Sequence, residues 1–228
     1  IFHYLQNFLF KEKRNGKKIR KIKAIKMQRL TIQKIIRKKN KIPITCLTAY
    51  TKDIAEIADK YCDIILVGDS LGMVLYGMKN TRNVKIDTMI AHAKVVRNFT
   101  KKSLIVVDMP FKTYTNKFLA LKNAKKIIKS TKCHAVKLEG GKEIVNTINY
   151  LVKRSIPVMG HIGLLPQSSK NFTLKGKKTS EKKRILKDAI AISNAGVFAM
   201  VIECVVEDLA KKISRTVPVP TIGIGASK

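Results

Sequence analysis

The chain has 228 residues, 45% of them hydrophobic, and it carries 47 Lys and Arg residues against 15 Asp and Glu residues. This length and composition are typical of a globular protein with a substantial core. No apolar run approaches the ~20 residues of a membrane span, so we predict a soluble protein.

The spacing of the cysteines and the kind of basic residue indicate which binding partners and which cellular compartment to expect. The four cysteines have no CxxC or CxxxC spacing, which argues against a zinc site or disulfides and favours a cytoplasmic location. A net charge of +32 would ordinarily suggest nucleic acid or an anionic membrane as partner. However, most basic residues are Lys spread along the chain with abundant Ile and Asn, whereas Arg makes the forked contacts of specific base readout. We attribute the charge to AT-rich coding bias at exposed positions and expect no specific nucleic-acid partner and no membrane partner.

The N-terminal 26 residues differ from the rest of the chain. They are rich in Lys and Arg, and an apolar patch precedes the charges, which is the reverse of the order in a secretory signal. We expect residues 1–26 to be an extension that is disordered or not native, and Met27 to be a plausible start. Residues 27–228 are predicted to form a single domain, beginning with a short amphipathic helix ahead of Pro43.

From Ile44 onward, seven apolar segments alternate with helical ones. The expected strands are residues 44–47, 64–67, 104–107, 135–138, 156–160, 198–202 and 219–222. The expected helices are residues 51–60, 88–100, 116–131, 142–154, 180–195 and 207–215. Apolar runs without polar alternation are typical of strands buried on both faces, as in a parallel sheet covered by helices.

Four of these strands end in an acid. Asp69 follows the second strand after Gly68, and Asp108, Glu139 and Glu203 close the third, fourth and sixth strands. A single acid could be a helix N-cap or a loop residue, but four at equivalent positions predict one carboxylate cluster. We expect a sharp glycine-dependent turn at residues 68–72.

The alternation predicts an α/β fold with a parallel sheet, either open and doubly wound or closed as a barrel. Acids from four separate strands favour a (β/α)8 TIM barrel, because closure brings many strand ends around one point. The chain stops just after strand seven, so we expect the barrel to lack its last strand and helices.

Seven motifs in order resemble the 3-methyl-2-oxobutanoate hydroxymethyltransferase family, also called ketopantoate hydroxymethyltransferase. They are LTAY at residues 47–50, VGDSLGM at 67–73, DMPF at 108–111, VKLEGG at 136–141, GHIGL with PQS at 160–168, ECV at 203–205 and IGIGA at 222–226. The resemblance runs from about Met27 to the end. Two segments depart from the family pattern, residues 81–85 and 171–176, and such loops normally cover the site.

The resemblance implies a phosphoenolpyruvate-mutase-like barrel, a bound Mg2+ and a homo-oligomer. It also implies transfer of a one-carbon unit from 5,10-methylenetetrahydrofolate to 3-methyl-2-oxobutanoate, which gives 2-dehydropantoate in pantothenate biosynthesis. By resemblance, the metal acids are Asp69, Asp108 and Glu139, and the catalytic base is Glu203. The substrate contacts implied in the same way are Asp69, Ser70, Asp108, Lys137 and His161.

The residue types suit this chemistry. A hard cation held by carboxylates can bind the oxygens of a 2-oxoacid and stabilise an enolate, and oxygen ligands favour Mg2+ or Mn2+ over zinc. Lys137 lies two residues before Glu139, so both side chains are expected to point into the barrel; the alternative for Lys137 is a structural ion pair. Cys204 is expected to face away from the barrel interior as a core residue, and His92 to pack or face solvent.

Two other functions stay open. One is a different Mg2+-dependent 2-oxoacid aldolase or lyase of the same superfamily. A dependence of the reaction on folate would distinguish the hydroxymethyltransferase from it. The other is a basic, non-catalytic binding protein, which a steeply salt-dependent affinity for DNA would support.

Overall fold

The computed structural model describes residues 29–169 and 171–226. The predicted extension at residues 1–26 and the start at Met27 lie outside this range. The described strands are β1 (Cys46–Thr48), β2 (Ile64–Val67), β3 (Leu104–Asp108), β4 (Ala135–Glu139), β5 (Val158–Gly163), β6 (Ala199–Glu203) and β7 (Thr221–Ile224). The described α-helices are α2 (Ile32–Ile36), α3 (Lys52–Tyr61), α4 (Leu71–Tyr76), α5 (Ile86–Asn98), α6 (Lys117–Thr131), α7 (Val145–Val152), α8 (Thr179–Asn194) and α9 (Glu207–Thr216). Two short 3-10 helices, η1 (Thr81–Asn83) and η2 (Lys142–Ile144), lie between them.

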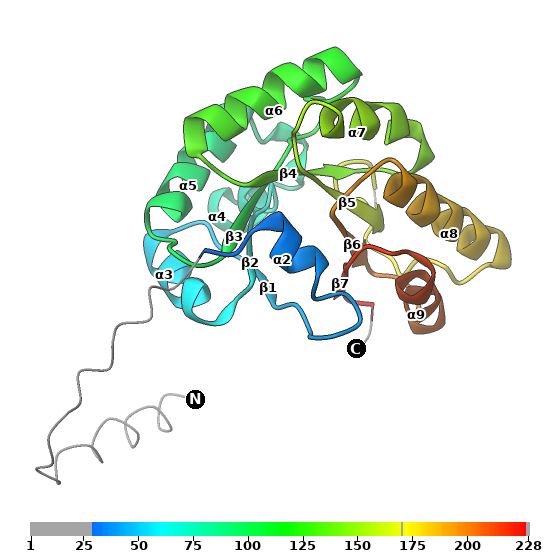
Figure 1. Cartoon of the computed structure of the whole chain (residues 1–228). Coiled ribbons are helices and arrows are strands. Elements are labelled where there is room, and N and C mark those ends of the chain that lie inside the picture. Colours follow the sequence, from blue (N-terminus) through cyan, green and yellow to red (C-terminus); the bar gives the residue numbers. More distant parts are fainter. Residues whose placement is uncertain (1–28, 170, 227–228) are drawn as a thin grey trace, which may run out of the picture.

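The strands form one parallel sheet in chain order, from β1 to β7. Figure 1 shows this sheet curved into a nearly closed barrel with α3 and α5 to α9 around its outside. The predicted barrel class is therefore confirmed. The expected lack of an eighth strand concerns the end of the chain and stays a prediction.

Side chains along the strands alternate between the barrel interior and the surrounding helices, as parallel strands require. The interior of the barrel holds Ile64, Leu104, Val106, Ala135, Met159, Ala199 and Val201. Residues between them, such as Ile65, Ile105 and Val136, pack under the helices in the larger apolar cluster. Strands β2 to β6 are thus buried on both faces along most of their length, which accounts for their unbroken apolar runs in the sequence.

Helix α2 closes the N-terminal end of the barrel. Ile35 is fully buried and packs with the interior cluster, and Figure 1 shows α2 lying across this end of the strands. An ion pair of 2.6 Å between Lys38 Nζ and Asp63 Oδ1 ties the segment after α2 to the start of β2. With this end sealed, the interior opens at the C-terminal ends of the strands.

The segment after β2 turns as predicted and then continues as a helix. The backbone N–H of Leu71 donates to Gly68 O at 3.2 Å, which closes a turn over residues 68–71, and Leu71–Tyr76 forms the helix α4, which ends at Gly77 with φ 63°. Gly72 serves close packing, because a Cβ on it would lie 2.5 Å from Val84 Cγ2. The turn itself is confirmed, but neither Gly68 nor Gly72 has a positive φ, so the glycines of this segment permit a tight helix end and a close contact rather than the turn.

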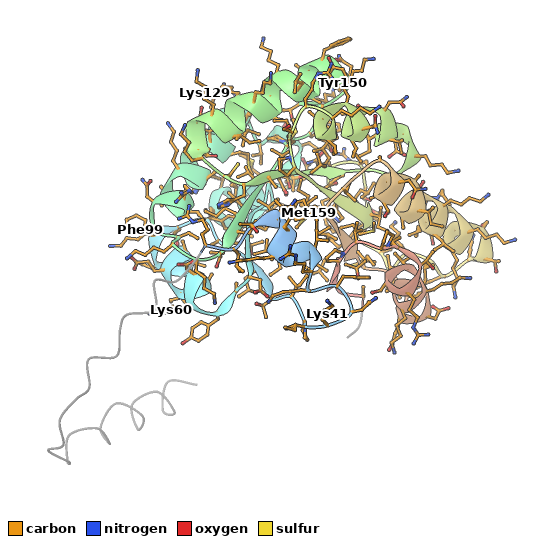
Figure 2. The ribbon with its side chains drawn as sticks, in the orientation of Figure 1. Lys41, Lys60, Phe99, Lys129, Tyr150 and Met159 are labelled. Carbon is orange, nitrogen blue, oxygen red and sulfur yellow. The ribbon has the colours of Figure 1, made fainter. Side chains whose placement is uncertain are left out.

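Charged side chains lie on the outer faces of the helices. Figure 2 shows Lys60 and Lys129 pointing away from the barrel, whereas Met159 lies within it. None of the helices in the described ranges is both long and apolar enough to cross a bilayer.

Asp59 near the end of α3 holds the segment that leads into β3. Its carboxylate accepts hydrogen bonds of 2.7–3.1 Å from the backbone N–H groups of Lys101, Lys102 and Ser103. Burial acts to raise the pKa of Asp59, but these hydrogen bonds outweigh it and the pKa is lowered. The ionised carboxylate is therefore part of the folded structure.

Replacing Asp59 with Asn should lower the free energy of unfolding at pH 7 by about 2 kcal/mol, because the amide cannot accept all of these hydrogen bonds. Because the folded pKa is below the unfolded one, the contribution is present above about pH 4 and is lost as the pH falls through the folded pKa. Urea unfolding at pH 7 and at decreasing pH should show the difference between wild type and Asp59→Asn shrinking. Glu56→Gln on the exposed side of α3 is the control and should cost no more than about 0.5 kcal/mol.

Candidate active site

A cavity of about 260 Å3 lies at the C-terminal ends of the strands. All seven predicted site residues line it: Asp69, Ser70, Asp108, Lys137, Glu139, His161 and Glu203. Leu66, Val201 and Ile224 are among its apolar lining residues. Strand ends far apart in the sequence thus meet around one small space, as the barrel prediction required.

The register of the sheet sets which polar side chains are neighbours. Asp108 on β3 is the register partner of Lys137 on β4, and Glu139 is the register partner of His161 on β5. Neighbours in register on parallel strands point to the same face, and alternate residues of one strand do so too. Lys137 and Glu139 therefore both face the interior, as the sequence predicted.

Lys137 is the buried cation of the site. Its Nζ lies 3.1 Å from Asp108 Oδ1 and 4.0 Å from Glu139 Oε1, and the residue is 4% exposed. Burial acts to lower the pKa of Lys137, but the charges of Asp108, Glu139 and Asp69 outweigh it and raise the pKa. Lys137 is thus a fixed positive charge at neutral pH.

His161 lies between two acids. Its Nδ1 is 3.5 Å from Glu139 Oε1 and 3.1 Å from Lys137 Nζ, and its Nε2 is 3.2 Å from Glu203 Oε2. Burial and the charge of Lys137 act to lower the pKa of His161, but the contacts with Glu139 and Glu203 outweigh them and raise it. The ring therefore connects the charged cluster on β4 with the carboxylate at the end of β6.

Asp69 and Asp108 carry more negative charge than Lys137 compensates. Burial, together with the charge of Asp108, raises the pKa of Asp69 to about 7. Burial also raises the pKa of Asp108, although Lys137 acts against it. Among the described lining residues, four carboxylates share the cavity with one Lys and one His side chain.

This arrangement suits a small divalent cation. Asp108 Oδ1 is buried and accepts no hydrogen bond from the described part of the chain, although Lys137 lies close to it. The backbone N–H of Asp69 donates to Asp108 Oδ2 at 3.1 Å, so the two residues are adjacent. No three His, Cys, Asp or Glu residues within 29–169 and 171–226 are arranged to hold an ion directly between them. Carboxylate oxygens such as those of Asp69 and Asp108 are the kind of donor that a hard cation such as Mg2+ prefers.

The sequence matches one family along nearly its whole length. The model of the ketopantoate hydroxymethyltransferase family matches residues 29–228. The chain belongs to the ketopantoate hydroxymethyltransferase family. The resemblance found in the sequence motifs is thereby confirmed, and so is the prediction of a transferase enzyme.

Two relatives give the extent of the match. The 3-methyl-2-oxobutanoate hydroxymethyltransferase of Pelagibacter ubique is 58% identical over 196 residues, which cover 86% of this chain and 76% of the relative. The enzyme of the same name from Phenylobacterium zucineum is 48% identical over 206 residues, which cover 89% and 75% of the two chains. Enzymes of this family act on small molecules, in agreement with the small cavity.

Solved structures agree in fold with this family member. A phosphonopyruvate hydrolase in complex with oxalate and Mg++ has a TM-score of 0.65 at 13% identity, covering 86% of this chain and 72% of that one. A 2,3-dimethylmalate lyase, described as a PEP mutase/isocitrate lyase superfamily member, has a TM-score of 0.62 at 14% identity, covering 85% and 71%. At these identities the likeness shows the fold alone, and it is the phosphoenolpyruvate-mutase-like barrel that we predicted.

Tyr50 is a site residue that we did not predict for this family member. Its hydroxyl is 2.6 Å from Ser70 Oγ, so it fixes the Ser70 side chain at the cavity wall. His92 Nδ1 lies 2.8 Å from Tyr50 O, and its Nε2 lies 2.8 Å from the hydroxyl of Tyr76. His92 thus packs against the loop that carries Tyr50, one of the two roles expected for it. Tyr50 belongs to the LTAY motif of the family, and this motif was the sequence signal that could have identified it as a site residue.

Gln167 on the loop after β5 was also missed. Its side-chain amide donates to Asp69 Oδ2 at 2.7 Å, and its backbone N–H donates to Glu139 Oε2 at 3.0 Å. The PQS motif contains it, but nothing in the periodicity indicates that this loop turns back into the barrel.

Cys204 is no nucleophile of this site. It follows Glu203 with φ 48° and is half-buried, and desolvation with the charge of Glu203 raises the pKa of its thiol. The raised pKa disfavours the reactive thiolate, which agrees with the expectation from sequence, although the side chain is less buried than a core residue.

Proposed function

We propose that the chain transfers a hydroxymethyl group from 5,10-methylenetetrahydrofolate to 3-methyl-2-oxobutanoate and forms 2-dehydropantoate in pantothenate biosynthesis. The observation that carries this proposal is the joining of strand-end carboxylates and Lys137 in one small cavity that also has apolar lining residues. The family match supports the reaction class. We further propose a cytoplasmic homo-oligomer, in line with the family resemblance.

The cavity walls suit a branched 2-oxoacid. Lys137 offers a buried positive charge for the carboxylate or the keto oxygen, and Ser70, fixed by Tyr50, offers a hydroxyl. The apolar lining residues Leu66, Val201 and Ile224 suit the two methyl groups of the substrate. Polar and apolar groups together would fix the orientation of the small molecule.

Asp69, Asp108 and Glu139 are the residues that we assign to Mg2+. When bound, the ion would supply a positive charge that stabilises the enolate form of the substrate. The solved phosphonopyruvate hydrolase with oxalate and Mg++ supports this assignment by its shared fold. Among the chain's own groups, Lys137 would remain paired with Asp108 and would limit the excess negative charge.

Glu203 is assigned as the base that removes the C3 proton. His161 Nε2 lies 3.2 Å from Glu203 Oε2 at the cavity wall. After proton removal, C3 would form a bond to the methylene carbon of the folate, both bonds between that carbon and the two folate nitrogens would break, and these nitrogens would take up the C3 proton and one proton of water. Water supplies the hydroxyl group, and tetrahydrofolate leaves. Glu203 is 20% exposed in its side chain, so it lies at the open side of the cavity, where a second substrate can approach.

The test separates proton removal from transfer. In D2O with Mg2+, the C3 proton of 3-methyl-2-oxobutanoate should exchange for deuterium without folate, and NMR measures the rate. Addition of 5,10-methylenetetrahydrofolate should then give 2-dehydropantoate. Absence of exchange from folded, Mg2+-loaded protein would overturn the proposal.

One other enzyme function is favoured by a specific observation. The solved relatives by fold include a hydrolase and a lyase, and these support a Mg2+-dependent 2-oxoacid lyase as the second candidate. Proton exchange without any folate-dependent product would favour it. The third possibility, a basic binding protein without chemistry, predicts no exchange and a steeply salt-dependent affinity for DNA.

A further inference from the structure

Gln167 connects two of the acids assigned to the cation. It is 3% exposed, and its Nε2 donates to Asp69 Oδ2 and also, at 2.9 Å, to Met109 O. Its backbone N–H donates to Glu139 Oε2, and its Oε1 accepts from the hydroxyl of Tyr114. One residue of the β5–α8 loop therefore orients a carboxylate at the end of β2 and another at the end of β4.

The loop that carries Gln167 is held by Arg82 of η1. Arg82 Nε donates to Gln167 O at 3.0 Å, and its Nη2 donates to Ser168 O at 3.3 Å and to Ser169 O at 3.2 Å. The guanidinium also lies 6.0 Å from the ring centre of Phe111 on the β3–α6 loop. Arg82 thus joins three loops at the mouth of the barrel.

These contacts require the shape of the guanidinium. Its planar fork reaches three successive carbonyl oxygens at once, whereas a Lys ammonium is a single point with a different reach. Arg82 lies in residues 81–85, one of the two segments in which the sequence departs from the family pattern, and it contacts the loop just before the other.

We propose that Gln167 is a positioning residue that fixes Asp69 and Glu139 for the divalent cation, and that Arg82 acts on cation affinity through Gln167 although it touches neither acid. The inference rests on the proposed function, because the acids are assigned to the cation there. Groups that orient metal ligands commonly change metal affinity by about 10–100-fold when they are removed. Because Gln167 lies on a loop, the affinity for the cation then depends on how firmly Arg82 holds that loop.

The test is a Mn2+ titration followed by electron paramagnetic resonance, which measures free Mn2+ and needs no substrate. Gln167→Met keeps the volume but removes the amide, and it should weaken Mn2+ binding about 10–100-fold. Arg82→Lys should weaken it by a smaller factor, about fivefold, because Gln167 is still present but its loop is less well fixed. The matched control is Arg97→Lys, since Arg97 also donates to two backbone carbonyls, Lys132 O and Thr100 O, away from the cavity. This control should leave Mn2+ affinity unchanged.

The double variant Arg82→Lys with Gln167→Met distinguishes positioning from a general loss of structure. If Arg82 acts through Gln167, the double variant should bind Mn2+ as weakly as Gln167→Met and no more weakly. Additive losses in the double variant, or Mn2+ affinity of Gln167→Met within twofold of wild type, would overturn the inference. If the wild-type protein exchanges the C3 proton and binds Mn2+, the proposed function stays supported even when one of these two outcomes overturns the inference. Wild type that does neither overturns both.

Discussion

Glu203→Gln should reduce the rate of C3 proton exchange by about 10³-fold, because general bases commonly contribute 10²–10⁴-fold. The amide has nearly the same shape as the carboxylate but cannot take the proton. Lys137, Asp108 and Asp69 keep their mutual contacts in this variant, so Mn2+ binding should stay close to that of the wild type. A large fall in rate with unchanged metal affinity would identify Glu203 as the group that acts on the proton.

The measurement is NMR of the substrate in D2O with saturating Mg2+, at several substrate concentrations. Glu207→Gln is the matched control, because Glu207 begins α9 four residues further along the chain, pairs with Lys211 and does not line the cavity. Its exchange rate should equal that of the wild type. Retention of more than a tenth of the wild-type rate in Glu203→Gln would assign the base to another residue.

The strand ends could be predicted because two signals coincide there. A strand buried on both faces must be apolar throughout, so an acid that closes it stands out, as Asp108 does after residues 104–107. The closure of the barrel then follows from the number of strands that supply such acids. The roles of the seven residues came from the family motifs, and they stay predictions until the variants are measured.

Strand beginnings were less accurate, and prolines explain two of the errors. The strands expected at residues 156 and 219 begin at Val158 and Thr221, directly after Pro157 and Pro220. Proline has no N–H to donate to the ladder, so regular pairing starts after it. The short helix α4 was not predicted because six residues show less than two turns of helical periodicity.

The supporting residues could not be found from periodicity. Tyr50, Gln167 and Arg82 lie in loops or in a short 3-10 helix, and their partners are 20 to 98 residues away in the chain. Such contacts depend on how the C-terminal loops fold over the barrel, which no local pattern specifies. Only the family motifs pointed to Tyr50 and Gln167, and Arg82 lies where this sequence departs from the family.

Lys137→Met should remove activity and also lower the free energy of unfolding of the metal-free protein by about 3–5 kcal/mol at pH 7, the usual cost of leaving a buried charge without its partner. The pKa of Lys137 is raised in the folded protein, so, as far as the protonation of Lys137 itself is concerned, its stabilising contribution is fully present below the unfolded pKa of about 10.4 and is lost as the pH rises through the folded value. At neutral pH the whole contribution is therefore measured. Met has a similar length and no charge, so the loss reflects the charge rather than a cavity.

Two further measurements separate this cause from a general packing defect. The pKa of Asp69 is raised to about 7 and that of Asp108 is also raised, so both acids are protonated more readily than usual as the pH falls. The deficit of Lys137→Met should therefore shrink between pH 7 and pH 5.

Adding Asp108→Asn removes the main partner, so the double variant should be more stable than the sum of the two single losses predicts, by more than about 1.5 kcal/mol. Urea unfolding of the four metal-free proteins measures this coupling. A pH-independent loss below 1 kcal/mol, with additive single effects, would mean that Lys137 does not hold the acids together. The full pattern would show that the site, before any cation binds, depends on one buried ammonium to keep its carboxylates in place.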